Sequence, residues 1–250
     1  MTSCAVAAAK APSATFEPIL ANPRSTSAAK TAILAKRAAV ADDKIGIPLS
    51  AKATGVAIAF PRSPMVMANA CWDIQVASNG RMVLGIGPQV KGHNERRFSV
   101  PWSAPGPRLK EYVLALKAIW RTWEKGVPLD FRGEHYQFTL CNSFFNPGPI
   151  EGIDTVPLYV AAVNQYNCRL AGELGDGIRM HPLNTPSYIQ NVIRPAVAEG
   201  AARAGRELSA VEFVVNPFFI TGTNEKEFAE SKKLIRKHLS FYAATRTYSS

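Results

Sequence analysis

From about residue 55 onward, two patterns of apolar and polar residues alternate along the chain. Runs dominated by apolar residues are typical of strands that are buried on both faces, as in parallel sheets. Apolar residues that recur at steps of three and four predict amphipathic helices. The apolar runs predict five strands, over residues 55–60, 82–86, 158–162, 177–180 and 211–220. Pro217 interrupts the last of these near its end.

Predicted helices follow the strands, directly after four of them and after a long loop in the case of the second. Three helix starts carry capping signals, namely Ser63 before Pro64, Thr185 before Pro186, and Asn224 followed by Glu227. The expected buried faces are Met67, Cys71 and Ile74; Leu109, Val113, Leu116, Trp120 and Trp123; Ile189, Ile193 and Val197; and Phe228, Ile235, Leu239 and Tyr242. The pattern also predicts a helix over residues 165–174, a hairpin over 129–140, a helix end near Gly126 and a kink at Pro195.

Strands that alternate with helices predict right-handed βαβ units and a parallel sheet. The sequence therefore predicts an α/β fold, and both a (β/α)₈ barrel and an open doubly wound sheet satisfy the pattern. Five strand–helix units are too few for a closed eight-stranded barrel, which typically needs about 250 ordered residues.

The first 53 residues have a different composition. Sixteen of the first 54 residues are alanine, and Phe16 is the only aromatic residue among them. Such a segment cannot bury enough apolar surface to offset the entropy of ordering it. We therefore expect a poorly ordered, low-complexity segment over residues 1–53 and a domain over residues 54–250. The acid-poor composition fits an organelle transit peptide, and it equally fits a segment that is not native coding sequence.

The net charge of +10 suggests a nucleic-acid partner, but the distribution of charge argues against one. Residues 1–60 hold seven basic and three acidic residues, and the other 190 hold 22 basic and 16 acidic residues, interspersed. Because no basic stripe with interleaved aromatic residues occurs, we expect no nucleic-acid partner. No apolar run approaches the roughly 18 residues of a membrane-spanning helix, so we expect no membrane partner either.

The four cysteines, at positions 4, 71, 141 and 168, lack the spacing of a metal knuckle, a redox pair or a disulfide framework. We therefore expect reduced thiols in a cytoplasmic protein, and no metal site.

Two short segments and two histidines are candidates for a functional site. Gly85-Ile86-Gly87 is not a dinucleotide-binding fingerprint, and it marks a strand end where backbone approaches a ligand or a neighbour closely. Residues 161–167 join a buried strand to a helix N-terminus, which could bind a phosphate, unless Asn164 merely caps the helix. His181 lies at the carboxyl end of a strand, where parallel folds place their catalytic groups, so it is either catalytic or a structural residue that packs and forms hydrogen bonds. His93 lies in a polar loop.

Several segments together resemble the luciferase-like monooxygenase superfamily of flavin and F420 oxidoreductases. Residues 54–64 and 81–87 resemble its third and fourth barrel strands, and residues 131–136, 157–162, 170–173 and 176–177 keep its order and approximate spacing. Residues 91–102 and 181–186 look most like the F420-dependent branch. The resemblance covers about residues 53–248 and implies a (β/α)₈ barrel of the TIM type, incomplete here, with strands three to seven readable.

The resemblance also implies where a cofactor would bind. A non-prolyl cis peptide bond would fall within Gly55, Val56 and Ala57, beside the flavin or deazaflavin ring. Gly85 to Pro88, including Gly87, would line the other side of the ring, and the cofactor phosphate would lie at Val163, Asn164 and Asn167. Pro88 stands where bacterial luciferases have an arginine, and loss of bidentate phosphate recognition favours coenzyme F420 over FMN.

The implied activity is hydride transfer with F420, or oxygen activation on reduced FMN, and the implied substrate is a small molecule. A homodimer is one assembly that the chain could form. His181 and His93 are the candidate catalytic groups on the substrate side. No segment before Thr54 has the pattern of the family's first two strands, and no segment has the pattern of its eighth strand. In the family, the second strand often carries an active-site histidine or acid. The alternative is therefore a catalytically impaired fragment or pseudoenzyme with at most weak cofactor binding.

Overall fold

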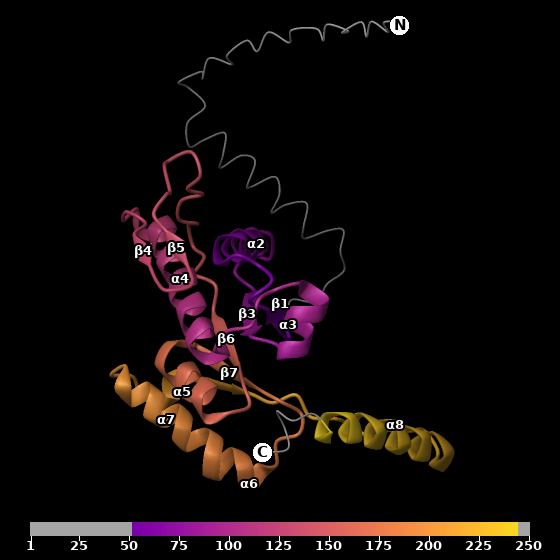
Figure 1. Ribbon diagram of the computed structural model, residues 1–250. Helices are drawn as coiled ribbons and strands as arrows, with labels where there is room; N and C mark the ends of the chain where they lie inside the picture. The colour runs from indigo at the N-terminus through magenta and orange to yellow at the C-terminus, as the bar shows by residue number, and fades with distance from the viewer. Residues whose placement is uncertain (1–51, 245–250) are drawn as a thin grey trace, which may run out of the picture.

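The computed structural model describes residues 52–244, whose arrangement is shown in Figure 1. The expected low-complexity segment lies almost wholly outside these residues, so its lack of order stays a prediction. The described part begins in a strand at Lys52, two residues before the predicted start of the domain.

A parallel sheet forms the centre of the described chain. Its strands are β1 (Lys52–Ala53), β2 (Ala57–Ile58), β3 (Met82–Gly87), β6 (Leu158–Ala162), β7 (Gly177–Met180) and β8 (Glu212–Val214). The order across the sheet is β1-β3-β6-β7-β8, and every pairing in it is parallel. β2 pairs with β3 farther along the same edge, so β1 and β2 are two halves of one edge strand. The predicted α/β fold with a parallel sheet is confirmed.

Helices fill the connections between the strands. They are α2 (Pro64–Ala77), α3 (Lys91–Phe98), α4 (Pro105–Lys125), α5 (Gln165–Leu174), α6 (Pro186–Tyr188), the π-helix η1 (Ile189–Ile193), α7 (Arg194–Arg203), the 3-10 helix η2 (Leu208–Ala210) and α8 (Glu225–Ala243). Ser63, Thr185 and Asn224 are N-caps as predicted, because each side chain accepts a hydrogen bond from a first-turn N–H. Gly126 ends α4 in the left-handed conformation, at φ 65°.

The predicted hairpin is also present, as the antiparallel strands β4 (Phe131–Arg132) and β5 (Gln137–Phe138). Glu111 of α4 holds its turn, because the carboxylate accepts hydrogen bonds from the backbone N–H groups of Glu134, His135 and Tyr136. A Cβ at Gly133 would lie only 2.0 Å from Glu111 Oε1, so a larger residue there would displace this carboxylate from the turn.

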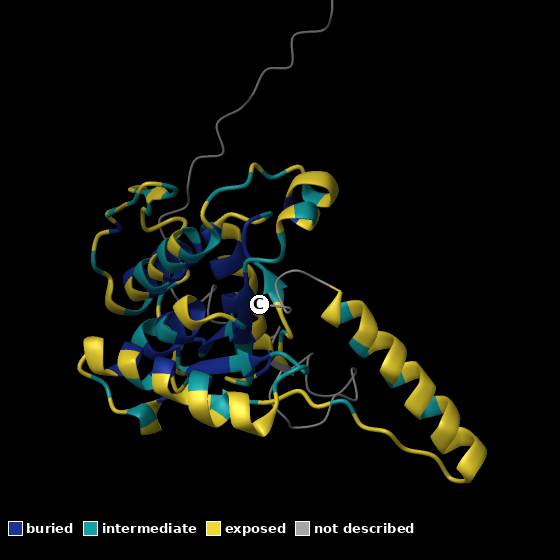
Figure 2. Cartoon of the chain, turned by 60° about the horizontal axis from the view of Figure 1, so that its bottom comes forward, coloured by how far each residue is buried: buried dark blue, intermediate teal, exposed yellow. Residues whose placement is uncertain are grey.

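The two faces of the sheet carry different residues. On one face the side chains of the central strands are at most 2% exposed, and they are Leu84, Ile86, Leu158, Val160, Ala162, Ile178 and Met180. They form one core with the apolar faces of α2, α4, α5 and α7, seen as dark blue strands beneath the helices in Figure 2. The opposite face carries the alternate residues, which are Gly85, Gly87, Tyr159, Ala161, Gly177, Arg179 and Glu212.

One prediction about α2 is wrong. Ile74 is 43% exposed, although the apolar spacing places it on the buried face. The neighbouring Gln75 is buried instead, because its amide donates to the carbonyl of Asp154 and accepts the N–H of Met82. These bonds connect α2 to the start of β3, so a satisfied polar side chain takes the buried position.

The C-terminal part departs further from the prediction. β8 spans Glu212–Val214, much less than residues 211–220. α8 contains no buried residue, Phe228 is 46% exposed, and Ile235, Leu239 and Tyr242 are half-buried. Figures 1 and 2 show α8 extending away from the rest of the described chain. The predicted buried stripe is therefore wrong for this helix.

Within residues 52–244, no helix has the length and apolarity needed to cross a bilayer. In the same part of the chain, no three His, Cys, Asp or Glu side chains gather in a way that could hold a metal ion.

Candidate functional site

A cleft of about 640 Å³ lies at the carboxyl ends of the parallel strands. Residues at or just after the ends of β3, β6 and β7 line it, together with the turn between β1 and β2 and the starts of α3, α4 and α5. The lining residues include Gly55, Val56, Gly87, Pro88, Lys91, Val163, Asn164, Asn167, Arg179, His181 and Asn216. Parallel α/β folds bind their ligands at this edge of the sheet.

The edge strand forms one wall of the cleft. The Gly55–Val56 peptide bond is cis, within the three residues where the family resemblance places such a bond. Thr54 Oγ1 donates a 2.7 Å hydrogen bond to the carbonyl of Gly85, which fixes this turn against β3. A Cβ at Gly87 would lie 3.1 Å from Ala161 Cβ and 3.3 Å from Val56 Cγ2, so the glycine leaves the wall flat.

The N-terminus of α5 forms a second wall. Asn164 caps the helix by accepting the N–H of Asn167 at 2.9 Å. Because the first N–H groups of a helix have no partner inside it, those of Gln165 and Tyr166 remain to bind a group outside. The Asn167 side chain is 6% exposed, and its Oδ1 atom is buried without a hydrogen-bond partner. This wall thus offers unpaired N–H donors and one unpaired acceptor, the amide oxygen of Asn167.

The charge of the lining is one-sided. Its ionisable side chains include the cations Lys91 and Arg179, and no Asp or Glu is among the described residues that line the cleft. Arg179 also has no carboxylate within ion-pair distance in the described part of the chain. A helix N-terminus adds further positive potential. The cleft therefore favours an anionic ligand.

His181 follows β7 and lines the cleft, half-buried. Its Nδ1 accepts the N–H of Leu183 at 3.3 Å, and its ring centroid lies 4.6 Å from that of Tyr242. Burial lowers the pKa of His181, so the ring is neutral at pH 7. With Nδ1 accepting, the ring proton belongs to Nε2.

The structure brings most of the sequence-predicted site residues together and leaves three elsewhere. Gly55, Val56, Gly87, Val163, Asn164, Asn167 and His181 all line the cleft. Ala57 packs against the core, and Gly85 lies beneath the edge strand, where a Cβ would be 2.1 Å from the carbonyl oxygen of Thr54. His93 is exposed on α3, outside the lining.

Sequence reasoning missed Arg179, Asn216 and Lys91. A signal existed for Arg179, because a charged residue interrupts an otherwise buried strand between Ile178 and Met180. Lys91 and Asn216 lie in polar segments and give no such signal.

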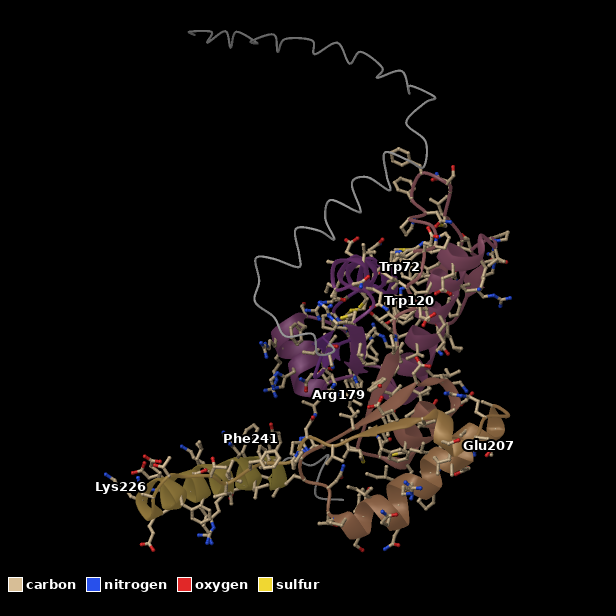
Figure 3. All side chains as sticks on the ribbon, turned by 180° about the vertical axis from the view of Figure 1, so that it is seen from behind. Trp72, Trp120, Arg179, Glu207, Lys226 and Phe241 are labelled. Atoms are coloured by element: carbon tan, nitrogen blue, oxygen red, sulfur yellow. The ribbon has the colours of Figure 1, made fainter. Side chains whose placement is uncertain are left out.

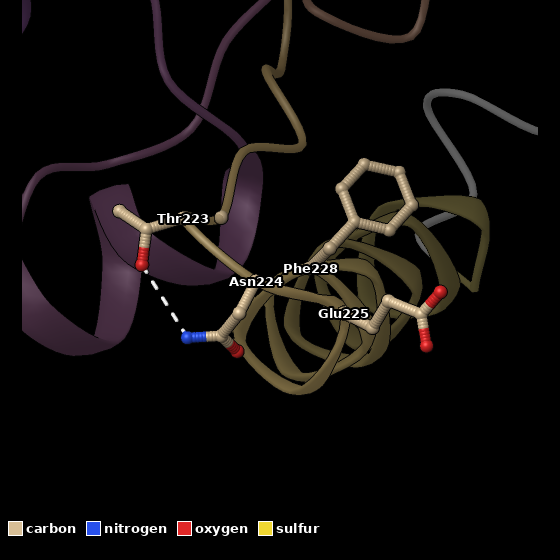
Figure 4. Close-up of a pocket in the computed structure, with 5 residues that line it drawn as sticks. Thr223, Asn224, Glu225 and Phe228 are labelled. Atoms are coloured by element: carbon tan, nitrogen blue, oxygen red, sulfur yellow. Dashed lines mark hydrogen bonds between the residues drawn. The ribbon is translucent and has the colours of Figure 1, made fainter.

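A second hollow, shown in Figure 4, lies at the start of α8 and is lined by Gly222, Thr223, Asn224, Glu225 and Phe228. Its capping groups bond to one another, since Asn224 Oδ1 accepts the N–H of Glu227 and the Glu227 carboxylate accepts from Thr223. This hollow is explained by helix capping.

Comparison with known proteins places the chain in a family. The model of the luciferase-like monooxygenase family matches residues 52–249. The chain belongs to this family. An uncharacterized protein of Mycobacterium tuberculosis is 39% identical over 195 residues, which are 78% of this chain and 57% of that protein. The chain thus spans little more than half the length of this curated relative.

Solved structures of the family's proteins share the fold. The coenzyme F420 dependent tetrahydromethanopterin reductase from Methanopyrus kandleri aligns with a TM-score of 0.64 at 20% identity, over 82% of this chain and 60% of that chain. An F420-dependent secondary alcohol dehydrogenase, solved with an F420–acetone adduct, aligns with a TM-score of 0.55 at 28% identity, over 65% of this chain and 48% of that one. Such luciferase-like proteins are TIM barrels, and the described sheet is a partial barrel of the same type.

Proposed function

We propose that the cleft binds coenzyme F420 and that the protein is an F420-dependent oxidoreductase acting on a small molecule. One observation carries the proposal. The cleft at the carboxyl edge of the sheet combines a helix N-terminus with two cations and contains no carboxylate among its described lining residues. A phosphate-bearing cofactor with a flat ring fits such a site.

The residues present fit the two ends of this cofactor. The unpaired N–H groups at the start of α5, with the side-chain amide N–H groups of Asn164 and Asn167, would hold the phosphate. The flat wall at Gly55, Val56 and Gly87 would receive the ring. A side chain at Gly87 would narrow this space, whereas one at Gly55 would meet the Arg179 guanidinium.

The deazaflavin, when bound, supplies hydride chemistry, and the protein supplies position and polarity. The two walls orient a ligand between the edge strand and α5. His181 lines the cleft as a neutral imidazole and gives it a polar group that can contact a substrate oxygen. The apolar wall residues exclude water from one side of the ligand.

F420 is preferred to FMN on two grounds. Pro88 provides no cation where a luciferase-type arginine would hold the FMN phosphate. The relative at 28% identity is named as F420-dependent. The family's name supports FMN, because a monooxygenase needs a flavin that activates oxygen.

Equilibrium titration of the full chain with F420 and with FMN tests the proposal. We expect tighter binding of F420, and a loss of about tenfold in F420 affinity for N167A, since a hydrogen bond to a charged group is removed or displaced. N191A is the matched control, because Asn191 is exposed and donates only to Ser187. Tighter binding of FMN at equal concentration, or equal effects of N167A and N191A, would overturn the assignment.

A second candidate is a protein that binds the cofactor but turns over little substrate. One observation favours it, namely that the outer edges of β1, β2 and β8 have no partner strand within residues 52–244. Catalysis in a barrel uses groups from several strand ends held by a closed scaffold. Oxidation of reduced F420 by this chain, compared with a chain extended by strands that would pair with these edges, distinguishes the two functions. Equal turnover supports the oxidoreductase, and a loss of about 10²-fold or more supports the impaired protein.

A further inference from the structure

Arg179 is one of the two cations on which the proposed function relies, but that function gives its guanidinium no specific contact with a ligand. It projects from β7 onto the open face of the sheet, between the buried residues Ile178 and Met180. A Cβ at Gly85 would lie 2.6 Å from Arg179 Cδ, and a Cβ at Gly55 would lie 3.2 Å from Arg179 Nη2. The side chain therefore crosses β3 and ends at the turn between β1 and β2, and Figure 3 shows its central position. Two glycines provide its path.

Most of the hydrogen-bonding capacity of this guanidinium is unused. Arg179 Nε is buried and has no hydrogen-bond partner. Nη2 reaches Asn216 Oδ1 only at 3.5 Å, the outer limit of a hydrogen bond. A guanidinium offers five N–H donors and stays charged at any ordinary pH, so this group lacks partners for most of its donors.

The neighbouring polar groups do not neutralise the charge. Glu212 lies on the same face of the sheet but makes no ion pair with Arg179 within the described residues, and its Oε2 accepts the Tyr159 hydroxyl. Burial, followed by the hydrogen bond to Glu212, raises the pKa of Tyr159 to about 12, and the phenol therefore stays neutral. Lys91, the other ionised group of the lining, has the same sign of charge as Arg179 and pairs at the surface with Glu95.

We propose that Arg179 binds an oxyanion group, a carboxylate, phosphate or sulfonate, of the small-molecule substrate. The identification of this anion as substrate rests on the proposed function, which assigns the cofactor phosphate to the start of α5. The guanidinium ends at Gly55, on the edge-strand wall, so it serves a second anionic group. Its planar pair of donors matches such a group bidentately.

Binding of small probes to the full chain without cofactor tests this site. Acetate, inorganic phosphate and methanesulfonate represent the three anion classes, and acetamide is the neutral counterpart of acetate. We expect the wild type to bind at least one of the anions with a Kd of about 1 mM, as for fragments of this size, and to bind acetamide no better than the variants do. R179M should bind that anion about 10- to 100-fold more weakly, and R179K should lie between.

Two controls keep the test independent of folding. R132M removes an exposed arginine that pairs with Asp130 on the hairpin, and it should bind the anion as the wild type does. In the wild type, the Arg179 Nε–H resonance, identified by its loss in R179K, should shift when the anion is added. This second readout needs no folded R179M.

The outcomes separate this inference from the proposed function. Anion binding that depends on Arg179, with F420 affinity of R179M within about threefold of wild type, supports both. The same anion binding in a chain that binds neither F420 nor FMN supports the oxyanion site and overturns the proposed function. Anion binding unchanged in R179M, or a tenfold loss of F420 affinity with no effect on the anions, overturns the inference, because Arg179 would then be structural or would serve the cofactor.

Discussion

α4 and α8 are the two longest helices of the described chain, with 21 and 19 residues, yet they pack in opposite ways. Both carry apolar residues at steps of three and four. α4 buries nine residues against α2 and the sheet, whereas α8 buries none. The aromatic contacts of α8 with the rest of the chain join its last turns to Phe218 and His181. An apolar stripe predicts that a helix forms, but its burial depends on a partner surface that lies elsewhere in the chain.

The largest expected effect is on the free energy of unfolding, when one leucine from each helix is replaced by alanine. Leu116 of α4 is 0% exposed and Leu234 of α8 is 54% exposed. L116A should lower the free energy of unfolding by about 2–5 kcal/mol, because it leaves a cavity in the core. L234A should change it by less than about 0.5 kcal/mol, as at an ordinary surface position. Urea unfolding measures both. Equal losses would show that α8 is covered in solution and would remove the contrast.

The sequence predicts well whatever is decided by neighbours within a few residues. The capping of α2 by Ser63, the end of α4 at Gly126 and the start of α5 at Gln165 follow from local chemistry, and all are confirmed. The predictions that fail depend on distant partners. Ile74 gives up its buried place because Gln75 bonds to Asp154 and Met82, and the predicted strand to residue 220 ends at Val214.

The candidate site follows the same division. Gly87 and Asn164 were predictable from the positions of the strand ends, because all parallel strands end at one edge of the sheet. Gly85 is kept out of the cleft by Thr54, and the open-face position of Arg179 depends on a glycine of β3 and on one in the turn between β1 and β2. His93 lies on the polar helix α3, which the pattern predicted as loop. No local pattern reports such long-range packing.

A second comparison uses two carboxylates that accept backbone N–H groups. Glu111 of α4 accepts three of them from the hairpin turn, and Glu227 of α8 accepts one from Thr223. E111A should cost about 1–3 kcal/mol, because it leaves partly buried donors unpaired. E227A should leave global stability unchanged and affect the start of α8 only, since that carboxylate is exposed. A loss of cooperativity in E111A without a lower midpoint would instead mean that the hairpin unfolds separately.

The helix caps give a smaller contrast of the same kind. Asn164 caps α5, which packs against α7 and β6, and Asn224 caps α8. N164A should lower the free energy of unfolding by about 1 kcal/mol in the absence of any cofactor. N224A should increase hydrogen exchange in the first turns of α8 and leave the urea midpoint in place. A matching shift of the midpoint in N224A would show that α8 unfolds together with the sheet.

The smallest expected effect is the pH response of the contact that joins the end of β7 to α8. Burial lowers the pKa of His181, and its Nδ1 accepts the Leu183 N–H while its ring packs on Tyr242. Below the unfolded pKa of about 6.5, the unfolded chain binds this proton more readily than the folded chain does. The stabilising contribution of the neutral ring is therefore fully present above that pH, and it is lost as the pH falls toward the folded pKa.

Urea midpoints of wild type and H181Q at pH 7.5 and pH 5.5 measure this contribution. The change in midpoint between the two pH values is compared between the two proteins, so that the effects of other acid-sensitive groups cancel. H93Q is the matched control, because His93 is exposed on α3. The wild type should lose more stability than H181Q on acidification while H93Q follows the wild type, and parallel losses in all three proteins would assign the acid sensitivity to other groups.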